Sequence, residues 1–177
     1  MNRAHFLASR RRLLKAGLFA GLGLALLGGG YAWLRTGKRD QLALYDARAR
    51  TLIAALAAAV LDGALPEPAA ERQRALAGLL EAVGQTIAGL SPQQREELGE
   101  LFALLNFSPA RFIVAGVRSP WHEARLDEVD NFLRRWRASR FALLRSAYAA
   151  LHDLILGAWY GRPESWAAIG YPGPPTL

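Results

Sequence analysis

The spacing of the apolar residues constrains this chain more than any other feature. From residue 40 onward they recur in steps of three and four, which places them on one side of a helix. No stretch alternates apolar and polar residues with the period of two that a half-buried strand requires. The chain has 177 residues, 52% of them hydrophobic, which is enough to bury one core. We therefore predict an all-α protein.

Glycines, prolines and capping residues divide this pattern into a compact bundle of about five to six helices. Ser91, Pro92 and Gln94 suit the N-cap, first and third positions of a helix, because together they satisfy free amides and pre-set the first turn. Ser139 is predicted to cap the last long helix. The apolar stripe of that helix comprises Phe141, Leu144, Tyr148, Leu151, Ile155 and Trp159. The predicted helices cover about residues 40–61, 69–90, 92–106, 108–114, 127–136 and 140–160.

The positive charge of the chain belongs to its amino-terminal segment. Residues 1–39 hold eight of the 22 Lys and Arg residues and none of the 15 Asp and Glu residues, so the formal net charge of +7 is unevenly distributed. The remaining 14 basic and 15 acidic residues leave a charge of −1 on residues 40–177. A folded part that is nearly neutral lacks the basic face that binds a phosphate backbone. We therefore expect no nucleic-acid partner.

An uncharged run over residues 16–34 follows the short basic motif Ser9-Arg10-Arg11-Arg12-Leu13-Leu14-Lys15. Basic residues, an apolar run and a charged flank are the layout of an export signal. The motif resembles twin-arginine translocation signals, whose pattern is Ser/Thr-Arg-Arg-x-Phe-Leu-Lys, with Leu13 at the position of Phe. The resemblance implies that the translocase reads Ser9, Arg10, Arg11, Leu13, Leu14 and Lys15. It also implies that a protein on this route crosses the membrane already folded.

The same uncharged run is long enough to act as a membrane anchor. Its 19 residues span about 28 Å as a helix, close to a hydrocarbon core of about 30 Å. Small residues at Gly30 and Ala32 permit cleavage before Trp33, but the segment has no clear A-x-A site, which favours a retained anchor. We expect residues 1–39 to be a signal and anchor in a bacterial inner membrane. The helical domain, residues 40–160, then lies on the periplasmic side, or free in the periplasm after cleavage.

The sequence offers no catalytic, cofactor-binding or metal site. With no cysteine, the chain has no disulfide, thiolate metal site, iron–sulfur cluster or c-type haem attachment. None of its three histidines has a second ligand at metal-binding spacing. His122 and His152 are each followed by a carboxylate, and adjacent residues are expected to point to different sides of a helix. No phosphate loop or nucleophile motif is present. We expect a chain that is not an enzyme.

Two segments are candidates for binding a partner protein. Arg134, Arg135, Arg137 and Arg140 surround Trp136, which indicates either a solvated helix face with a buried Trp or a docking patch for an acidic surface. Residues 158–175 contain four aromatic residues and four prolines, so residues 161–177 are predicted to be an extended tail. This tail packs on its own helices or lies across a partner. The candidate partner-binding residues are Trp136, Trp159, Tyr160, Trp166, Tyr171, Pro172 and Pro174.

The carboxyl-terminal third resembles a known family. The residues that carry the resemblance are Trp136, Arg137, Ser139, Tyr148, Leu151, His152, Trp159, Tyr160, Pro163, Ser165, Trp166 and the run Ile169-Gly170-Tyr171-Pro172-Gly173-Pro174. Over about residues 115–175 the chain is similar to the gluconate 2-dehydrogenase subunit 3 family. Leu65 and Pro66 depart from the family pattern, since many members have an acidic residue and a Pro-Gly-Ala sequence there.

The resemblance implies a small helical accessory subunit. Such subunits often carry a twin-arginine signal and accompany a GMC-type dehydrogenase that binds FAD and lacks its own signal. The implied function is escort of that partner through the twin-arginine pathway, with FAD in the partner and no cofactor in this chain. A membrane-anchored helical interaction protein with an unrelated partner is the alternative, and an enzyme in its own right is a third.

Overall fold

The structure is a computed structural model that describes residues 44–166 and 170–172. The described residues all belong to one compact unit, Gln41–Leu177. The predicted signal and anchor over residues 1–39, including all six translocase-recognition residues, lies outside the described residues, as does Pro174.

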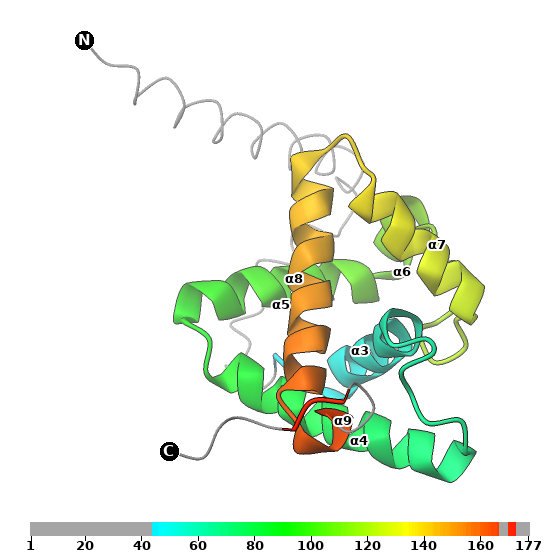
Figure 1. Cartoon of the computed structure of the whole chain (residues 1–177). Helices are drawn as coiled ribbons and strands as arrows, with labels where there is room; N and C mark the ends of the chain where they lie inside the picture. Colours follow the sequence, from blue (N-terminus) through cyan, green and yellow to red (C-terminus); the bar gives the residue numbers. More distant parts are fainter. Residues whose placement is uncertain (1–43, 167–169, 173–177) are drawn as a thin grey trace. The chain divides into compact units, whose positions relative to one another are not determined.

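All regular structure in the described part of the chain is helical, and no strand occurs there (Figure 1). The predicted all-α class is confirmed for these residues. Five helices of 12 residues or more form the body of the domain. In chain order the elements are α3 (Ala47–Val60), α4 (Ala69–Ala88), α5 (Pro92–Asn106), α6 (Ser108–Ala110), the π-helical turn η2 (Arg111–Ala115), α7 (Leu126–Arg137), α8 (Ala142–Tyr160) and α9 (Pro163–Trp166).

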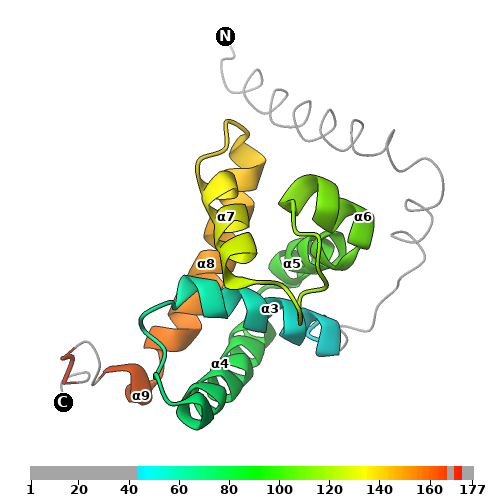
Figure 2. The same ribbon diagram turned by 90° about the vertical axis from the view of Figure 1, so that its right-hand side faces the viewer.

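Helix α3 lies in the middle of the domain and contacts α4, α5, α7 and α8 (Figure 2). Leu52, Ile53 and Leu56 on this helix are fully buried. Helix α3 begins later than the predicted residue 40, because the Asp46 carboxylate accepts a hydrogen bond from the Ala49 amide at 2.9 Å and caps it there.

The predicted boundary between α4 and α5 is confirmed. The Ser91 hydroxyl accepts a hydrogen bond from the Gln94 amide at 3.3 Å, and the Gln94 side chain accepts one from the Ser91 amide at 3.0 Å. Pro92 occupies the first helical position, where its missing N–H costs no hydrogen bond. This reciprocal capping box starts α5 at the residue the sequence indicates.

The short helix predicted over residues 108–114 is divided in two. Helix α6 covers only Ser108–Ala110, and the chain then widens into the π-helical turn η2. Gly116 ends the turn with a φ of +65°, a left-handed conformation that favours glycine. The Arg135 guanidinium lies against this glycine and donates to the Ala115 carbonyl, so α7 closes over the end of η2.

Helix α7 follows its prediction, whereas the start of α8 does not. Val129, Phe132, Leu133 and Trp136 are buried, and Arg134 pairs with Asp130 at 2.8 Å, as the spacing indicates. The predicted cap at Ser139 is wrong. Its hydroxyl accepts from the Phe141 amide at 3.2 Å, and α8 begins at Ala142 with no side-chain cap. The prediction that Phe141 faces inward is also wrong, since it precedes the first turn of α8 and is exposed.

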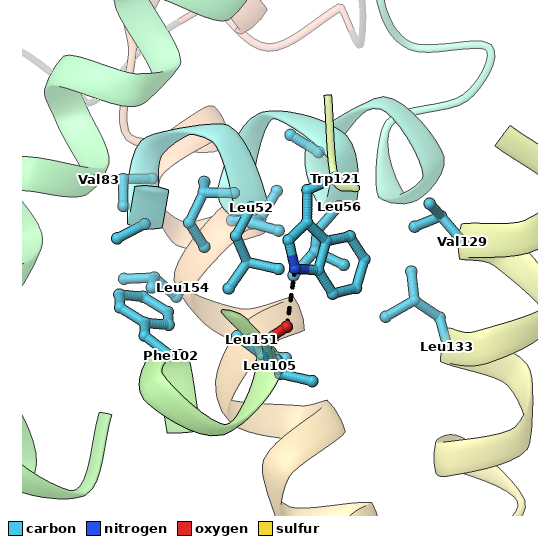
Figure 3. Packing of buried hydrophobic residues seen from close by; sticks show 14 of the residues in the cluster. Leu52, Leu56, Val83, Phe102, Leu105, Trp121, Val129, Leu133, Leu151 and Leu154 are labelled. Carbon is cyan, nitrogen blue, oxygen red and sulfur yellow. Dashed lines mark hydrogen bonds between the residues drawn. The ribbon is translucent and has the colours of Figure 1, made fainter. Parts of the chain in front are cut away.

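A tryptophan from the segment between η2 and α7 completes the core. Figure 3 shows the Trp121 indole among the leucines of α3 and α8, with its N–H directed at the Leu105 carbonyl. This hydrogen bond is 2.9 Å long and satisfies one of the carbonyls that the end of α5 leaves without a helical partner. The Trp121 ring also packs on Phe132, whose ring meets Trp136 edge-on at 4.7 Å.

No single helix in the described residues is long and apolar enough to cross a membrane. Helix α5 and the segment Ser108–Ala115 reach the length and apolar composition of a membrane span only when taken together, and the chain bends by 80° between them.

The central position of Phe132 predicts a large effect on stability. Phe132→Ala is expected to lower the free energy of unfolding by about 3–5 kcal/mol, because it opens a cavity between Trp121 and Trp136. Phe112→Ala is the matched control, since the Phe112 side chain is exposed and its truncation is expected to cost less than about 0.5 kcal/mol. Denaturant titration followed by circular dichroism measures both. Equal losses would contradict the core described here.

Candidate partner-binding surface

The chain does not become extended directly after α8. Pro163–Trp166 form the short helix α9, so the prediction of an extended segment is wrong for these residues. Pro163 suits the first position of such a helix, and the Ser165 hydroxyl donates to the Arg162 carbonyl at 2.8 Å. The start of the predicted tail is therefore folded.

Arg162 holds the start of the tail against α4. Its guanidinium donates to the Ala75 carbonyl at 3.1 Å, across 87 positions of sequence. Gly78 makes this approach possible, because a Cβ at that position would collide with the guanidinium. The Glu164 carboxylate lies 3.6 Å from Arg162 on the outer side. Of the two alternatives for the tail, packing on its own helices describes Arg162.

Tyr160, the last residue of α8, is joined by hydrogen bonds to two aromatic residues that follow it. The Trp166 indole N–H donates to the Tyr160 carbonyl at 2.8 Å, and the Tyr171 amide donates to the Trp166 carbonyl at 3.0 Å. The rings of Trp166 and Tyr171 meet edge-on at 5.4 Å. Gly170, with a φ of +68°, permits the reversal that brings Tyr171 back. We call Tyr160, Trp166, Tyr171 and the exposed Pro172 the aromatic end.

The aromatic end is the part of the predicted contact surface that remains accessible. Tyr160 is 41% exposed and Tyr171 is 45% exposed, although both belong to the residue types that interfaces bury most often. The Tyr160 carbonyl and the Tyr171 amide are already hydrogen-bonded within the chain, so a partner would cover side-chain surface without breaking these hydrogen bonds.

Trp136 and Trp159 belong to the core instead. They are 2% and 6% exposed, and the Trp136 indole donates to the Val114 carbonyl at 3.1 Å. Of the two interpretations of the arginine run, a helix face with a buried Trp describes residue 136 correctly. Neither tryptophan offers its side chain to a partner in this structure, because the helical period turns both toward the domain interior.

A groove that the sequence did not predict lies beside α3. It has a volume of about 470 Å³ and includes three small residues of that helix, Ala54, Ala55 and Ala58. Arg50, which pairs with Glu81 at 2.6 Å, and Trp121 contribute to its walls. The repeated alanines of α3 are the sequence feature that could have predicted this groove, because small side chains leave room beside a helix.

Tyr45 lies next to Arg50, and its pKa differs from that of a free tyrosine. Burial disfavours its phenolate and raises the pKa of Tyr45 to about 12, while the guanidinium of Arg50, 5.5 Å from the ring centre, acts in the opposite direction. The side chain is therefore neutral at physiological pH.

His122 and His152 each lie close to the carboxylate of the residue that follows. His122 lies 3.2 Å from the Glu123 carboxylate and His152 lies 3.5 Å from the Asp153 carboxylate, so the expectation that these neighbours diverge is wrong. His122 lies in a turn, where the helical argument does not apply. In the part of the chain that the structure describes, no three His, Cys, Asp or Glu residues form a group able to hold a metal ion.

No protein-family model matches this chain, and no curated protein or solved structure matches it either. The fold and the surfaces above are therefore described from this chain alone.

The contact of Arg162 with Gly78 predicts that one methyl group loosens the tail. Gly78→Ala is expected to displace the guanidinium and lower hydrogen-exchange protection of the Tyr171 amide, while alanine stabilises α4 by about 1 kcal/mol. Gly157→Ala is the control, because a Cβ there meets nothing within 4 Å. It should stabilise α8 by a similar amount and leave Tyr171 protected. Unchanged protection in Gly78→Ala would show that Arg162 does not hold the tail.

Proposed function

We propose that this chain is a non-catalytic escort subunit that carries a partner protein through the twin-arginine pathway. The observation that supports this most strongly is the Ser9-Arg10-Arg11 motif ahead of an uncharged run, on a chain without cysteine or a cofactor motif. The pathway transports folded proteins, so its use is best explained by a cargo that acquires its cofactor before export. The simplest such cargo is the partner.

The proposed partner is a GMC-type dehydrogenase that binds FAD and has no signal of its own. The resemblance of residues 115–175 to the gluconate 2-dehydrogenase subunit 3 family supports this choice. In this proposal the partner folds around FAD in the cytoplasm and binds the small subunit. The complex then crosses the inner membrane and stays at its periplasmic face through residues 16–34.

The aromatic end is the surface we assign to partner binding. Tyr160 and Tyr171 provide accessible aromatic area, and Trp166 between them is fixed by its hydrogen bond to the Tyr160 carbonyl. The Trp166 and Tyr171 rings already pack edge-on against each other, so little of their side-chain entropy is left to lose when a partner covers them. Arg162 strengthens the argument, since it joins the aromatic end to α4 rather than leaving it as a loose tail.

The escort proposal predicts that export of the partner depends on two arginines of this chain. Arg10→Lys combined with Arg11→Lys is expected to leave both proteins in the cytoplasm, because it keeps the charge but removes the paired guanidinium groups. Cell fractionation with antibodies to each protein is the measurement. Arg12→Lys, at the variable position of the motif, is the matched control and should leave export intact. Partner found in the periplasm of the double variant would refute the escort role.

The assignment of the aromatic end predicts a selective loss of affinity. Tyr160→Ala with Tyr171→Ala is expected to weaken binding of the dehydrogenase by about tenfold or more for each residue, as truncated interface aromatics commonly do. Phe112→Ala removes an exposed aromatic ring on η2 and should leave affinity unchanged. Co-purification followed by titration calorimetry compares the variants. The assignment fails if Phe112→Ala weakens binding and the tyrosine pair does not.

A further inference from the structure

The turn between α7 and α8 concentrates positive charge on a domain that is nearly neutral as a whole. Residues 131–152 contain five arginines and no Asp or Glu residue. Arg134 is paired with Asp130, and Arg135 is held by the Ala115 carbonyl. Arg137 and Arg140 form no ion pair with any described residue. Two guanidinium groups at this turn are therefore available to an external anion.

Exposed apolar side chains stand directly beside these arginines. Phe141 is 46% exposed and Leu143 is 40% exposed. The Arg140 guanidinium lies 4.8 Å from the centre of the Phe141 ring, so charge and apolar surface are in contact. Arg145 donates to the Ser139 carbonyl at 2.7 Å, which keeps its guanidinium at the same turn. We call Arg137, Arg140, Phe141, Leu143 and Arg145 the basic corner.

The first turn of α8 adds to the positive potential of the basic corner. No side chain caps this 19-residue helix, because the Ser139 hydroxyl binds the Phe141 amide instead. The uncapped amino end of a helix carries a partial positive charge and favours anions. The unpaired arginines, the exposed apolar side chains and the uncapped start of α8 all suit a partner with an anionic surface layer above an apolar interior.

We propose that the basic corner binds the surface of an anionic lipid bilayer. Arginines attract the lipid phosphates, and the rings and aliphatic side chains beside them enter the boundary between headgroups and acyl chains. The turn lies at one end of the domain in both Figure 1 and Figure 2, opposite the amino end of α4, and no other labelled helix extends beyond it in either view.

The length of chain before α3 fits this arrangement. Residues 35–43 separate the uncharged run from the first described residue, and nine residues reach at most about 30 Å. A domain on so short a connection stays within reach of the bilayer that holds residues 16–34. This step rests on the proposed membrane anchor, whereas the charge and exposure of the basic corner do not.

The absence of cysteine makes a direct test possible. Ala142→Cys in the full chain places one environment-sensitive fluorophore at the basic corner, and Ala69→Cys places the same probe at the amino end of α4. Both alanines are exposed. Each labelled chain is mixed with vesicles of phosphatidylglycerol and phosphatidylcholine, or of phosphatidylcholine alone. Sedimentation measures whether the chain is bound, and the emission wavelength measures whether the probe touches lipid.

The expected result is a blue shift at residue 142 in anionic vesicles and none at residue 69. The blue shift gives the equilibrium constant between chains whose probe touches lipid and chains whose probe does not. Arg137→Gln with Arg140→Gln should lower this constant by about fivefold for each charge removed. Arg72→Gln with Arg74→Gln removes the same charge from two exposed arginines of α4 and should leave the shift at residue 142 unchanged.

Several results would overturn the inference. It fails if residue 142 shows no blue shift in anionic vesicles, whether or not the chain sediments with them, or if the shift is equal in phosphatidylcholine alone. A shift that requires addition of the dehydrogenase would assign the basic corner to an acidic protein surface instead. None of these results depends on export, so loss of lipid contact and loss of the escort function are separately observable.

Discussion

Burial of one face of α3 is the constraint on which the remaining structure depends. Leu52, Ile53 and Leu56 are fully buried because α4, α5, α7 and α8 all contact this helix. A face that four helices cover needs partners that fit closely, since a void in a packed core loses both contacts and burial. Trp121 fills the remaining space from an irregular segment, and its hydrogen bond to the Leu105 carbonyl fixes where that segment lies.

The same dependence reaches the proposed contact surface. Helix α8 packs against α3 and α4, and the carboxyl end of α8 carries Tyr160 to the edge of the domain. Arg162 then joins the following residues to the Ala75 carbonyl of α4. The aromatic end is therefore placed by the core, and its Tyr160 and Tyr171 side chains remain partly exposed. Such an arrangement suits a surface that must be rigid before a partner arrives.

Net charge describes this domain poorly. Residues 40–177 sum to −1, yet residues 131–152 carry five arginines without a carboxylate. Acidic residues concentrate elsewhere, as at Glu96, Glu97 and Glu100 of α5, where burial together with the like charges of its neighbours raises the pKa of Glu100. Segregation of charge on a nearly neutral domain lets different surfaces attract different partners.

The sequence by itself determined the helical class, the capping box at Ser91 and the inward face of α7, because these depend on residues three or four positions apart. Only the tertiary structure decided that Phe141 is exposed and that Arg162 reaches α4. The physical reason is distance along the chain. Local spacing shows which side of a helix is apolar, but it does not show which distant segment covers that side or leaves it open.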